Sequence, residues 1–278
     1  MKLFTDINEC ISYSEKAIKQ YSFICDMVMQ SDYNKWTNKL EQCNDFEDFL
    51  VGENAKLNVL NTSVLIGYCF SKSHIDSLFF HYKNLFKKLN TYLGTFPELI
   101  KDKEFNAKLK NLENLNFLST LSELSLAFSM KKLGLNVKFE TKFIQLKSGK
   151  KRDVDISVSD KDGNELHFEV YMPNKQLDLN GFFNPNQDDS HFSTKIDKKL
   201  FDKFGVDGIS GLNGLVLLAI NKVFFDMIHV KTCLPFMGND NIYNDLVKLI
   251  PKDVSGLYLY EDDFSGENSF RFEKIILK

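Results

Sequence analysis

The stretch from Arg152 to Tyr171 constrains the fold most, because its turn and its alternation together fix one strand register. The three loop residues 161–163 end in Gly163, which suits a type I turn closed by a left-handed residue. The resulting pairs are Val154 with Val170, Asp155 with Glu169, Ile156 with Phe168, and Ser157 with His167. A slip of one residue would mix apolar with polar partners. The sequence therefore predicts an antiparallel hairpin with one apolar and one polar face.

The polar face of this hairpin brings two acids into direct opposition. Asp155 and Glu169 stand across the ladder with Cβ atoms roughly 5 Å apart. Facing carboxylates repel each other, and a bound cation is the simplest feature that makes the arrangement favourable. Carboxylate oxygens suit Mg²⁺ or Mn²⁺. The alternative is that this face, which also carries Asp153, His167 and Tyr171, lies in water with its acids solvated.

Length and composition restrict the class of protein. The 278 residues are 43% apolar and include 26 phenylalanines, so one large or two modest domains can form. The net charge of the chain is −3. A global basic field is absent, so any nucleic-acid surface must be local. Only two residues are arginines, Arg152 and Arg271, so phosphate contacts would be made mostly by lysines.

The cysteines and the apolar stretches indicate a compartment. The five cysteines form no C-x-x-C pair and are typical of free thiols in a reducing environment. The N-terminus shows no signal-peptide pattern. The most apolar stretch, Val59 to Phe70, is too short to span a bilayer. We expect a cytoplasmic protein with no membrane partner.

The first part of the chain, residues 1–112, is predicted to be helical throughout. Its clearest helix runs from Ser73 to Tyr92, with Gly94 as the stop signal. Pro97 and the charged segment that follows it mark a boundary. Residues 113–278 are then a second, α/β domain.

The second domain begins with a helix from Asn114 to Met130, in which Glu123 is the one charged residue. A lone carboxylate among Leu, Phe, Ala, Ser and Thr is costly unless it is protonated, paired or bound to a cation. Glu123 is either a structural acid bonded to a hydroxyl or the backbone, or a third acid directed at the hairpin site. The sequence leaves both open.

The remaining elements of this domain follow in order. A strand at Leu135–Thr141 precedes the hairpin, and a helix from Ser193 to Phe204 follows it. Lys195 and Lys199 lie on that helix at helical spacing. The apolar run Leu215–Ile220 is typical of a central strand buried on both faces. A short helix at Asn241–Ile250 and strands at Leu257–Tyr260 and Phe270–Leu277 complete the domain.

The order helix, strand, strand, strand, helix, strand, with acids on the first helix and on the second and third strands, resembles the PD-(D/E)XK nuclease superfamily. The resemblance covers about Asn114 to Asn221. It implies a restriction-endonuclease-like αβββαβ core with a mixed sheet, preceded by the all-helical N-terminal region. It also implies that Glu123, Asp155 and Glu169 bind Mg²⁺ or Mn²⁺, with Asp153 as the alternative to Asp155.

The chain departs from the family pattern at two positions. Val154 stands where the family often has proline. Tyr171 stands where the family has a lysine two residues after the glutamate, and a neutral tyrosine cannot carry that charge. Lys175, Lys195 or Lys199 would have to supply it. The implied chemistry is metal-assisted phosphodiester hydrolysis, in which a lysine stabilises the transition state.

The resemblance implies a nuclease acting on nucleic acid, on DNA or alternatively on RNA, in a restriction, mobile-element or defence role. The alternative is a nuclease-like fold that has lost cleavage and works as a nucleic-acid-binding or scaffold protein, which Tyr171 favours. The D-x-D triplet at 153–155 also matches sugar-nucleotide transferases, but no nucleotide-binding βα units precede it. The helical region would form a homodimer, gate the site or clamp the nucleic acid.

Overall fold

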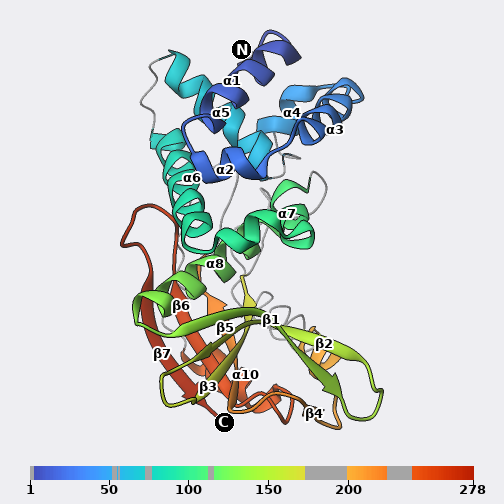
Figure 1. Ribbon diagram of the computed structural model, residues 1–278, viewed down its shortest axis with the longest axis vertical. Coiled ribbons are helices and arrows are strands. Elements are labelled where there is room, and N and C mark those ends of the chain that lie inside the picture. Colours follow the sequence, from blue (N-terminus) through green and yellow to red (C-terminus); the bar gives the residue numbers. More distant parts are fainter. Residues whose placement is uncertain are drawn as a thin grey trace. The chain divides into compact units, whose positions relative to one another are not determined.

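The structure is a computed structural model that describes residues 3–51, 55, 57–72, 77–111, 116–172, 199–223 and 240–278. These residues form two compact units (Figure 1). The first unit holds the described residues up to Leu124, together with Asp263–Ser269. The second holds the described residues from Ser125 to Asp262, together with Phe270–Lys278. The division falls inside a helix, beyond the boundary predicted at residue 112.

The first unit is built from helices, as predicted. They are α1 (Ile7–Ile18), α2 (Ser22–Met27), α3 (Gln30–Glu41), α4 (Phe46–Val51), α5 (Val59–Lys72), α6 (Ser77–Thr95), the 3₁₀ helix η1 (Pro97–Lys101), α7 (Lys103–Lys110) and the start of α8 (Asn116–Lys132). Asp6 caps α1 by accepting a hydrogen bond from the backbone of Glu9 at 2.9 Å. Within the described residues, no helix has the length and apolar character that crossing a membrane requires.

Two glycines in this unit allow neighbouring parts of the chain to approach closely. The prediction that Gly94 ends α6 is wrong, because the helix continues to Thr95. A Cβ atom at Gly94 would lie 2.5 Å from Cε2 of Phe23, so Gly94 makes room for that ring. A Cβ atom at Gly67 on α5 would lie 1.9 Å from the carbonyl oxygen of Tyr13 on α1. Packing, rather than helix termination, accounts for both glycines.

The second unit contains a seven-stranded mixed sheet in the order β4-β1-β2-β3-β5-β6-β7. The strands are β1 (Asn136–Gln145), β2 (Lys151–Ser159), β3 (Glu165–Tyr171), β4 (Ile209–Ser210), β5 (Leu215–Asn221), β6 (Gly256–Glu261) and β7 (Arg271–Leu277). β1, β2 and β3 are antiparallel, β3, β5 and β6 are parallel, and β7 is antiparallel to β6. The protein is therefore a mixed α/β structure, and Leu215–Asn221 is a central strand, as predicted.

The hairpin has the predicted turn and register. Gly163 has a φ of 84°, and its N–H bonds to the carbonyl oxygen of Asp160 at 3.3 Å. The observed pairs are Ile156 with Phe168, Ser157 with His167, Val158 with Leu166 and Ser159 with Glu165. The pairing ends there, one residue before Asp155 and Glu169. The prediction is confirmed up to the two acids, where the strands stop pairing.

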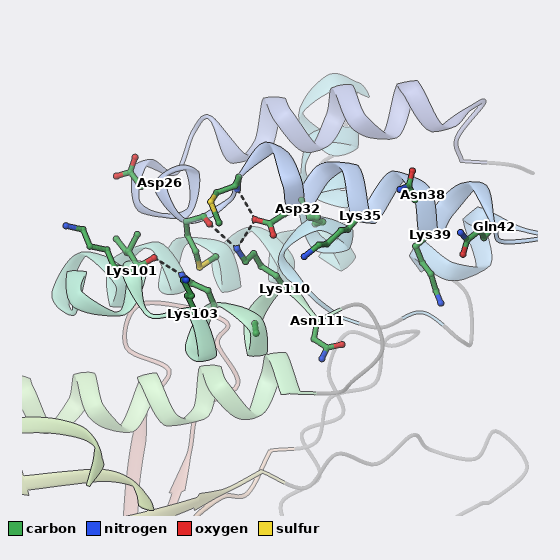
Figure 2. A pocket seen from close by; sticks show the side chains of 16 residues that line it. Asp26, Asp32, Lys35, Asn38, Lys39, Gln42, Lys101, Lys103, Lys110 and Asn111 are labelled. Carbon is green, nitrogen blue, oxygen red and sulfur yellow. Dashed lines mark hydrogen bonds and ion pairs between the residues drawn. The ribbon is translucent and has the colours of Figure 1, made fainter. Parts of the chain in front are cut away.

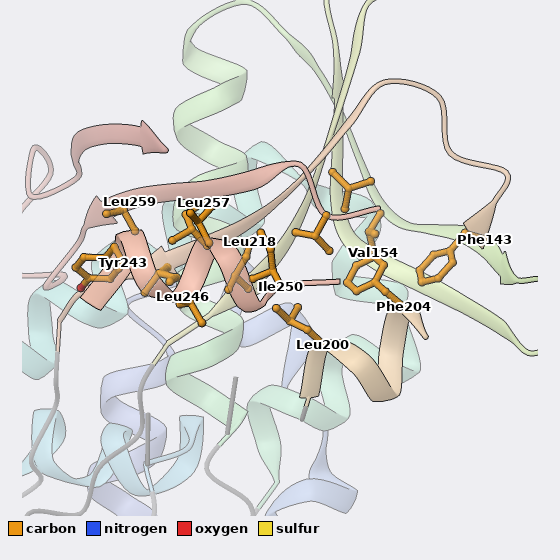
Figure 3. Packing of buried hydrophobic residues seen from close by; sticks show 14 residues of the cluster. Phe143, Val154, Leu200, Phe204, Leu218, Tyr243, Leu246, Ile250, Leu257 and Leu259 are labelled. Carbon is orange, nitrogen blue, oxygen red and sulfur yellow. The ribbon is translucent and has the colours of Figure 1, made fainter. Parts of the chain in front are cut away.

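One face of the sheet packs against α10 (Asp240–Leu249) and a helical segment at residues 199–204. Figure 3 shows Leu200 and Phe204 of that segment beside Phe143 and Val154, and Tyr243, Leu246 and Ile250 near β5 and β6. The opposite face is also buried, since Ile156, Phe168, Leu217 and Ala219 are at most 1% exposed. Sandwiching the sheet in this way buries the part of the hairpin's polar face that carries His167 and Glu169.

Candidate active site

The parallel pairing of β3 with β5 determines where the polar side chains of the hairpin point. His167 pairs with Val216, Glu169 with Leu218 and Tyr171 with Ile220. Val216, Leu218 and Ile220 belong to the buried apolar cluster, so their partners on β3 project to the same covered face. Glu169 and His167 are each only 1% exposed. The expectation of a solvated polar face is therefore wrong for these two side chains.

Where the pairing of β2 with β3 ends, the side chain of Asp155 takes the place of a main-chain carbonyl as a hydrogen-bond acceptor. Its Oδ2 accepts a hydrogen bond of 2.7 Å from the backbone N–H of Val170, the residue after Glu169. A carboxylate that accepts a main-chain N–H is held in a fixed position. Asp155 thus stays next to Glu169 although the two residues are no longer paired as strand neighbours.

Lys203 joins the two acids. Its ammonium makes a short contact with Oε2 of Glu169 and lies 3.4 Å from Oδ1 of Asp155. The side chains of Lys203 and Asp155 are 18% and 15% exposed. Because the ion pairs are largely shielded from water, their Coulomb energy is screened less than at a surface. The three side chains form a compact charged cluster.

Lys199 completes this cluster from the preceding helical turn. Its ammonium lies 3.4 Å from Oε1 of Glu169, and its side chain is 49% exposed. The same ammonium is 5.7 Å from the ring centroid of Tyr171, within cation–π range. Tyr171 therefore touches the site but supplies an aromatic face rather than a charge. We call Asp155, Glu169, Lys199 and Lys203 the acid–lysine cluster.

The helical segment that carries both lysines is anchored to the sheet at its C-terminal end. The rings of Phe204 and Phe143 stack with centroids 5.2 Å apart and an interplanar angle of 5°. The side-chain amide of Gln145 donates hydrogen bonds of 3.0 Å and 2.9 Å to the carbonyl oxygens of Asp202 and Lys203. These bonds satisfy carbonyls that a helix end leaves without an internal partner. Gln145 and the ring pair together fix the position of Lys203.

The environment of Glu169 changes its acidity. Burial, followed by the negative charge of Asp155, raises the pKa of Glu169 to about 7, although Lys203 and Lys199 act in the opposite direction. The two acids raise the pKa of Lys203 above its ordinary value against the effect of burial. Lys203 is therefore charged at neutral pH, while Glu169 exchanges its proton there.

A strained backbone position lies on β1, next to the strand that carries Asp155. The pairing of β1 with β2 passes from Phe139–Ile156 to Thr141–Val154, and Glu140 between them has a φ of 51°. This left-handed conformation is uncommon for a residue other than glycine. Strained residues of this kind gather at functional sites, where the surrounding structure maintains them. Glu140 on β1 therefore stands opposite Asp155 on β2, the residue at which regular pairing between β2 and β3 has ended.

His167 is a structural neighbour rather than a member of the cluster. Its Nδ1 lies 2.6 Å from the hydroxyl of Ser157, and its Nε2 lies 2.6 Å from the carbonyl oxygen of Asn213. A carbonyl can only accept, so Nε2 carries a proton and donates it to Asn213, and Nδ1 shares a hydrogen bond with the serine hydroxyl. Both ring nitrogens are thereby used in holding β3 to β2 and to the loop before β5.

The predicted site residues fall into three groups. Asp155, Glu169 and Lys199 are brought together. Asp153 instead forms an exposed ion pair of 2.9 Å with Lys142 on β1. Glu123 is half-buried on α8 in the first unit, and Lys175 and Lys195 lie outside the described residues. Of the two hairpin aspartates, Asp155 is therefore the one in the cluster.

Lys203 was missed by the reasoning from sequence. Residues 195, 199 and 203 are all lysines, four apart on the predicted helix, so they share one face. That spacing is the signal in the sequence that points to Lys203.

The donor set of the cluster fits a hard divalent cation. Oε1 of Glu169 is buried and accepts no hydrogen bond from the described residues, with Lys199 as its ionic neighbour. Mg²⁺ is commonly held by one or two carboxylates together with waters and substrate phosphates. Asp155 and Glu169 supply those two carboxylates. Within the described ranges, no three His, Cys, Asp or Glu side chains are grouped as a ready-made metal site.

No family model, curated protein or solved structure matches this chain.

Proposed function

We propose that the protein is a metal-dependent nuclease that hydrolyses phosphodiester bonds of DNA, with RNA as the alternative substrate. The observation that carries the proposal is the convergence of Asp155 and Glu169 on the ammonium of Lys203, with Lys199 beside them. Two acids and two lysines in a partly exposed cluster provide ligands for a cation and positive charge for a phosphate. We propose Asp155 and Glu169 as the ligands of Mg²⁺ or Mn²⁺.

When bound, a divalent cation supplies an acidified water and neutralises charge on the phosphate. Individual residues of the chain have distinct roles in this proposal. The N–H of Val170 holds Asp155 in place. Glu169 releases its proton near neutral pH, which prepares a second anionic ligand.

Lys203 is our candidate for the charge that Tyr171 does not supply. It reaches both acids from a neighbouring helix, and its raised pKa keeps it protonated. An ammonium at this point can stabilise negative charge that develops on the phosphate in the transition state. Lys199, which is half-exposed, is placed to contact a phosphate nearer to solvent.

The order of elements supports a restriction-endonuclease-like core as the finer description of the fold. α8 precedes β1, β2 and β3, and the helical segment at 199–204 precedes β5. The acids come from the second and third of these strands. This order of elements is the one that the PD-(D/E)XK resemblance implies.

A second function, nucleic-acid binding without cleavage, is favoured by one specific observation. Lys203 and Lys199 together already offset the charges of the two acids, so the cluster needs no cation to be stable. In that case the acid–lysine cluster would be a structural ion-pair network.

Cleavage assays with matched variants separate the two functions. Plasmid, single-stranded DNA and RNA are incubated with the protein and Mg²⁺ or Mn²⁺, alongside Asp155→Asn and Glu169→Gln, which preserve side-chain size. Asp153→Asn is the control, because Asp153 forms an exposed ion pair on the same strand. We expect wild type and Asp153→Asn to cleave DNA and the other two variants to lose roughly 10²-fold or more of that rate.

Inactivity of the wild type on every substrate and with both metals would refute the nuclease. Equal activity in all four proteins would show a contaminating enzyme and would also refute it. If the inactive wild type still bound DNA, the second function would replace the first.

A further inference from the structure

The first unit contains a cavity that the nuclease proposal does not use. It has a volume of about 850 Å³ and lies between α3 on one side and η1 and α7 on the other. Figure 2 shows Lys35 extending from α3 towards Lys110 of α7, with Lys39 further along α3. This size is within the range of sites that hold small molecules.

The wall of this cavity is positively charged. Five lysines and two aspartates line it, an excess of three positive charges in a chain whose net charge is −3. Lys110 and Asp32 neutralise each other at 2.7 Å, with side chains only 10% and 14% exposed. Among the described residues, no hydrogen bond or ion pair engages the side chains of Lys35, Lys101 and Lys103. These three side chains are exposed, so the local excess of positive charge can attract an anion from solution.

A buried amide in the same wall calls for a different group. Asn106 is 8% exposed, and its Nδ2 donates a hydrogen bond of 2.6 Å to the carbonyl oxygen of Ile100. Its Oδ1 is buried and accepts no hydrogen bond from the described residues. A buried acceptor without a donor is costly. Because an ionised phosphate offers only acceptors, an anion alone would leave Asn106 unsatisfied.

The remaining surface of the cavity is apolar and suits a flat ring system. It is formed by Met27, Met29, Leu60, Ile100 and Ala107. Methionine side chains adapt to the shape of a ring and contact aromatic groups favourably. A ligand that matches all parts of the wall has a negative group, an N–H donor and an apolar ring face.

We propose that this cavity binds a nucleotide, with its phosphates at Lys35 and Lys103 and an amino or imino N–H of its base at Asn106. The ligand can be a free nucleotide or the terminal nucleotide of a nucleic-acid strand, since both present the same groups. The proposal does not depend on cleavage at the acid–lysine cluster.

The single tryptophan of the chain provides a direct reporter. Trp36 follows Lys35 on α3, is buried, and donates a hydrogen bond of 2.8 Å to Asn61, the neighbour of the lining residue Leu60. Tryptophan emission and calorimetry are recorded during titration of the full chain with ATP, GTP, CTP and UTP. Pyrophosphate, the four nucleosides and a 5′-phosphorylated single-stranded oligonucleotide are titrated in parallel. EDTA is present throughout, so that metal-dependent cleavage does not contribute.

Four variants locate the binding. Lys35→Gln and Lys103→Gln remove charge but keep most of the side chain, and Lys19→Gln is the control on the exposed end of α1. We expect at least one nucleotide to bind more tightly than pyrophosphate and its own nucleoside. We expect each pocket variant to weaken this binding about tenfold and the control to leave it unchanged. Asn106→Leu should abolish the advantage of the nucleotide over pyrophosphate, provided that its thermal unfolding remains cooperative.

The oligonucleotide distinguishes the two sources. If it displaces the nucleotide and binds more tightly, the pocket takes the end of a strand, and if it does not compete, the pocket takes free nucleotide. Equal affinity for pyrophosphate and every nucleotide would reduce the cavity to a simple anion site and overturn the proposal. Failure of all probes to bind at millimolar concentration, or binding that Lys35→Gln and Lys103→Gln leave intact, would also overturn it.

Discussion

The Oδ2 atom of Asp155 accepts a hydrogen bond of 2.7 Å from the backbone N–H of Val170, at the point where β2 and β3 stop pairing. Regular pairing would set Asp155 directly across from Glu169. The side-chain bond takes the place of a ladder bond and leaves the two carboxylates free to converge on Lys203. A local defect in the sheet thus creates the acid–lysine cluster.

Removal of the Lys203 charge should destabilise the second unit. Lys203→Met keeps the aliphatic stem but leaves two shielded carboxylates without their shared cation. We expect a loss of about 3–5 kcal/mol at pH 8, as for other broken buried pairs. The loss should be smaller at pH 5, where Glu169 is protonated. Urea denaturation of the wild type and the variant at pH 8 and at pH 5 measures the two losses in the free energy of unfolding.

The matched control is Lys142→Met, since Lys142 forms an exposed ion pair with Asp153. This change should cost about 0–1 kcal/mol. Similar losses in both variants would show that Lys203 is not a specific counter-ion.

The raised pKa of Glu169 should make stability fall as pH increases from about 4.5 to about 7. In that interval the unfolded chain has released this proton while the folded chain still holds it, so unfolding becomes more favourable. Above pH 7 both states are ionised and this contribution becomes constant. Glu169→Gln cannot titrate and should flatten the dependence, which thermal unfolding at successive pH values would reveal. A curve with the same slope in both proteins would contradict the assignment.

Metal-dependent stabilisation should increase with pH, because a cation binds the ionised form of Glu169 and competes with its proton. We expect the increase in Tm on adding Mn²⁺ to be greater at pH 8 than at pH 6. Asp155→Asn and Glu169→Gln should abolish the increase, and Asp153→Asn should retain it. A shift that survives in the first two variants would place the metal elsewhere.

Gly67→Ala should destabilise the first unit although alanine is the better helix former by about 1 kcal/mol. The added methyl group would lie 1.9 Å from the carbonyl oxygen of Tyr13, so α1 and α5 must separate. We expect a net loss of about 1–3 kcal/mol by chemical denaturation.

Gly266→Ala is the control for this change, because a methyl group at Gly266 meets nothing within 4 Å. It should stay within about 0.5 kcal/mol of wild type. A stabilised Gly67→Ala would show that propensity outweighs the close approach.

Much of the second unit could be predicted from local pattern. The loop that ends in Gly163 and the apolar alternation around it determined the register from Ile156 to Ser159. The unbroken apolar run at Leu215–Ile220 predicted a central strand, since both of its faces must be buried, and the observed strand is Leu215–Asn221. These predictions succeed because turn geometry and the period of a strand are short-range properties.

Predictions at the ends of elements and at their interfaces were less accurate. Glycine commonly ends a helix, but Gly94 instead makes room for the ring of Phe23. Glu140 reads as an ordinary strand residue, and only the structure reveals its left-handed backbone. Both depend on neighbours that are distant in sequence, which a local pattern does not report.

For the site, the sequence by itself determined that Asp155 and Glu169 lie at adjacent places on neighbouring strands, because the turn and the alternation admit one register. Tertiary structure decided the rest. Packing of the sheet on both faces buried Glu169, and the Phe143–Phe204 stack with the Gln145 bonds placed Lys203 between the acids. Burial and charge pairing depend on which element covers a strand, and that is settled only when the helix packs on the sheet.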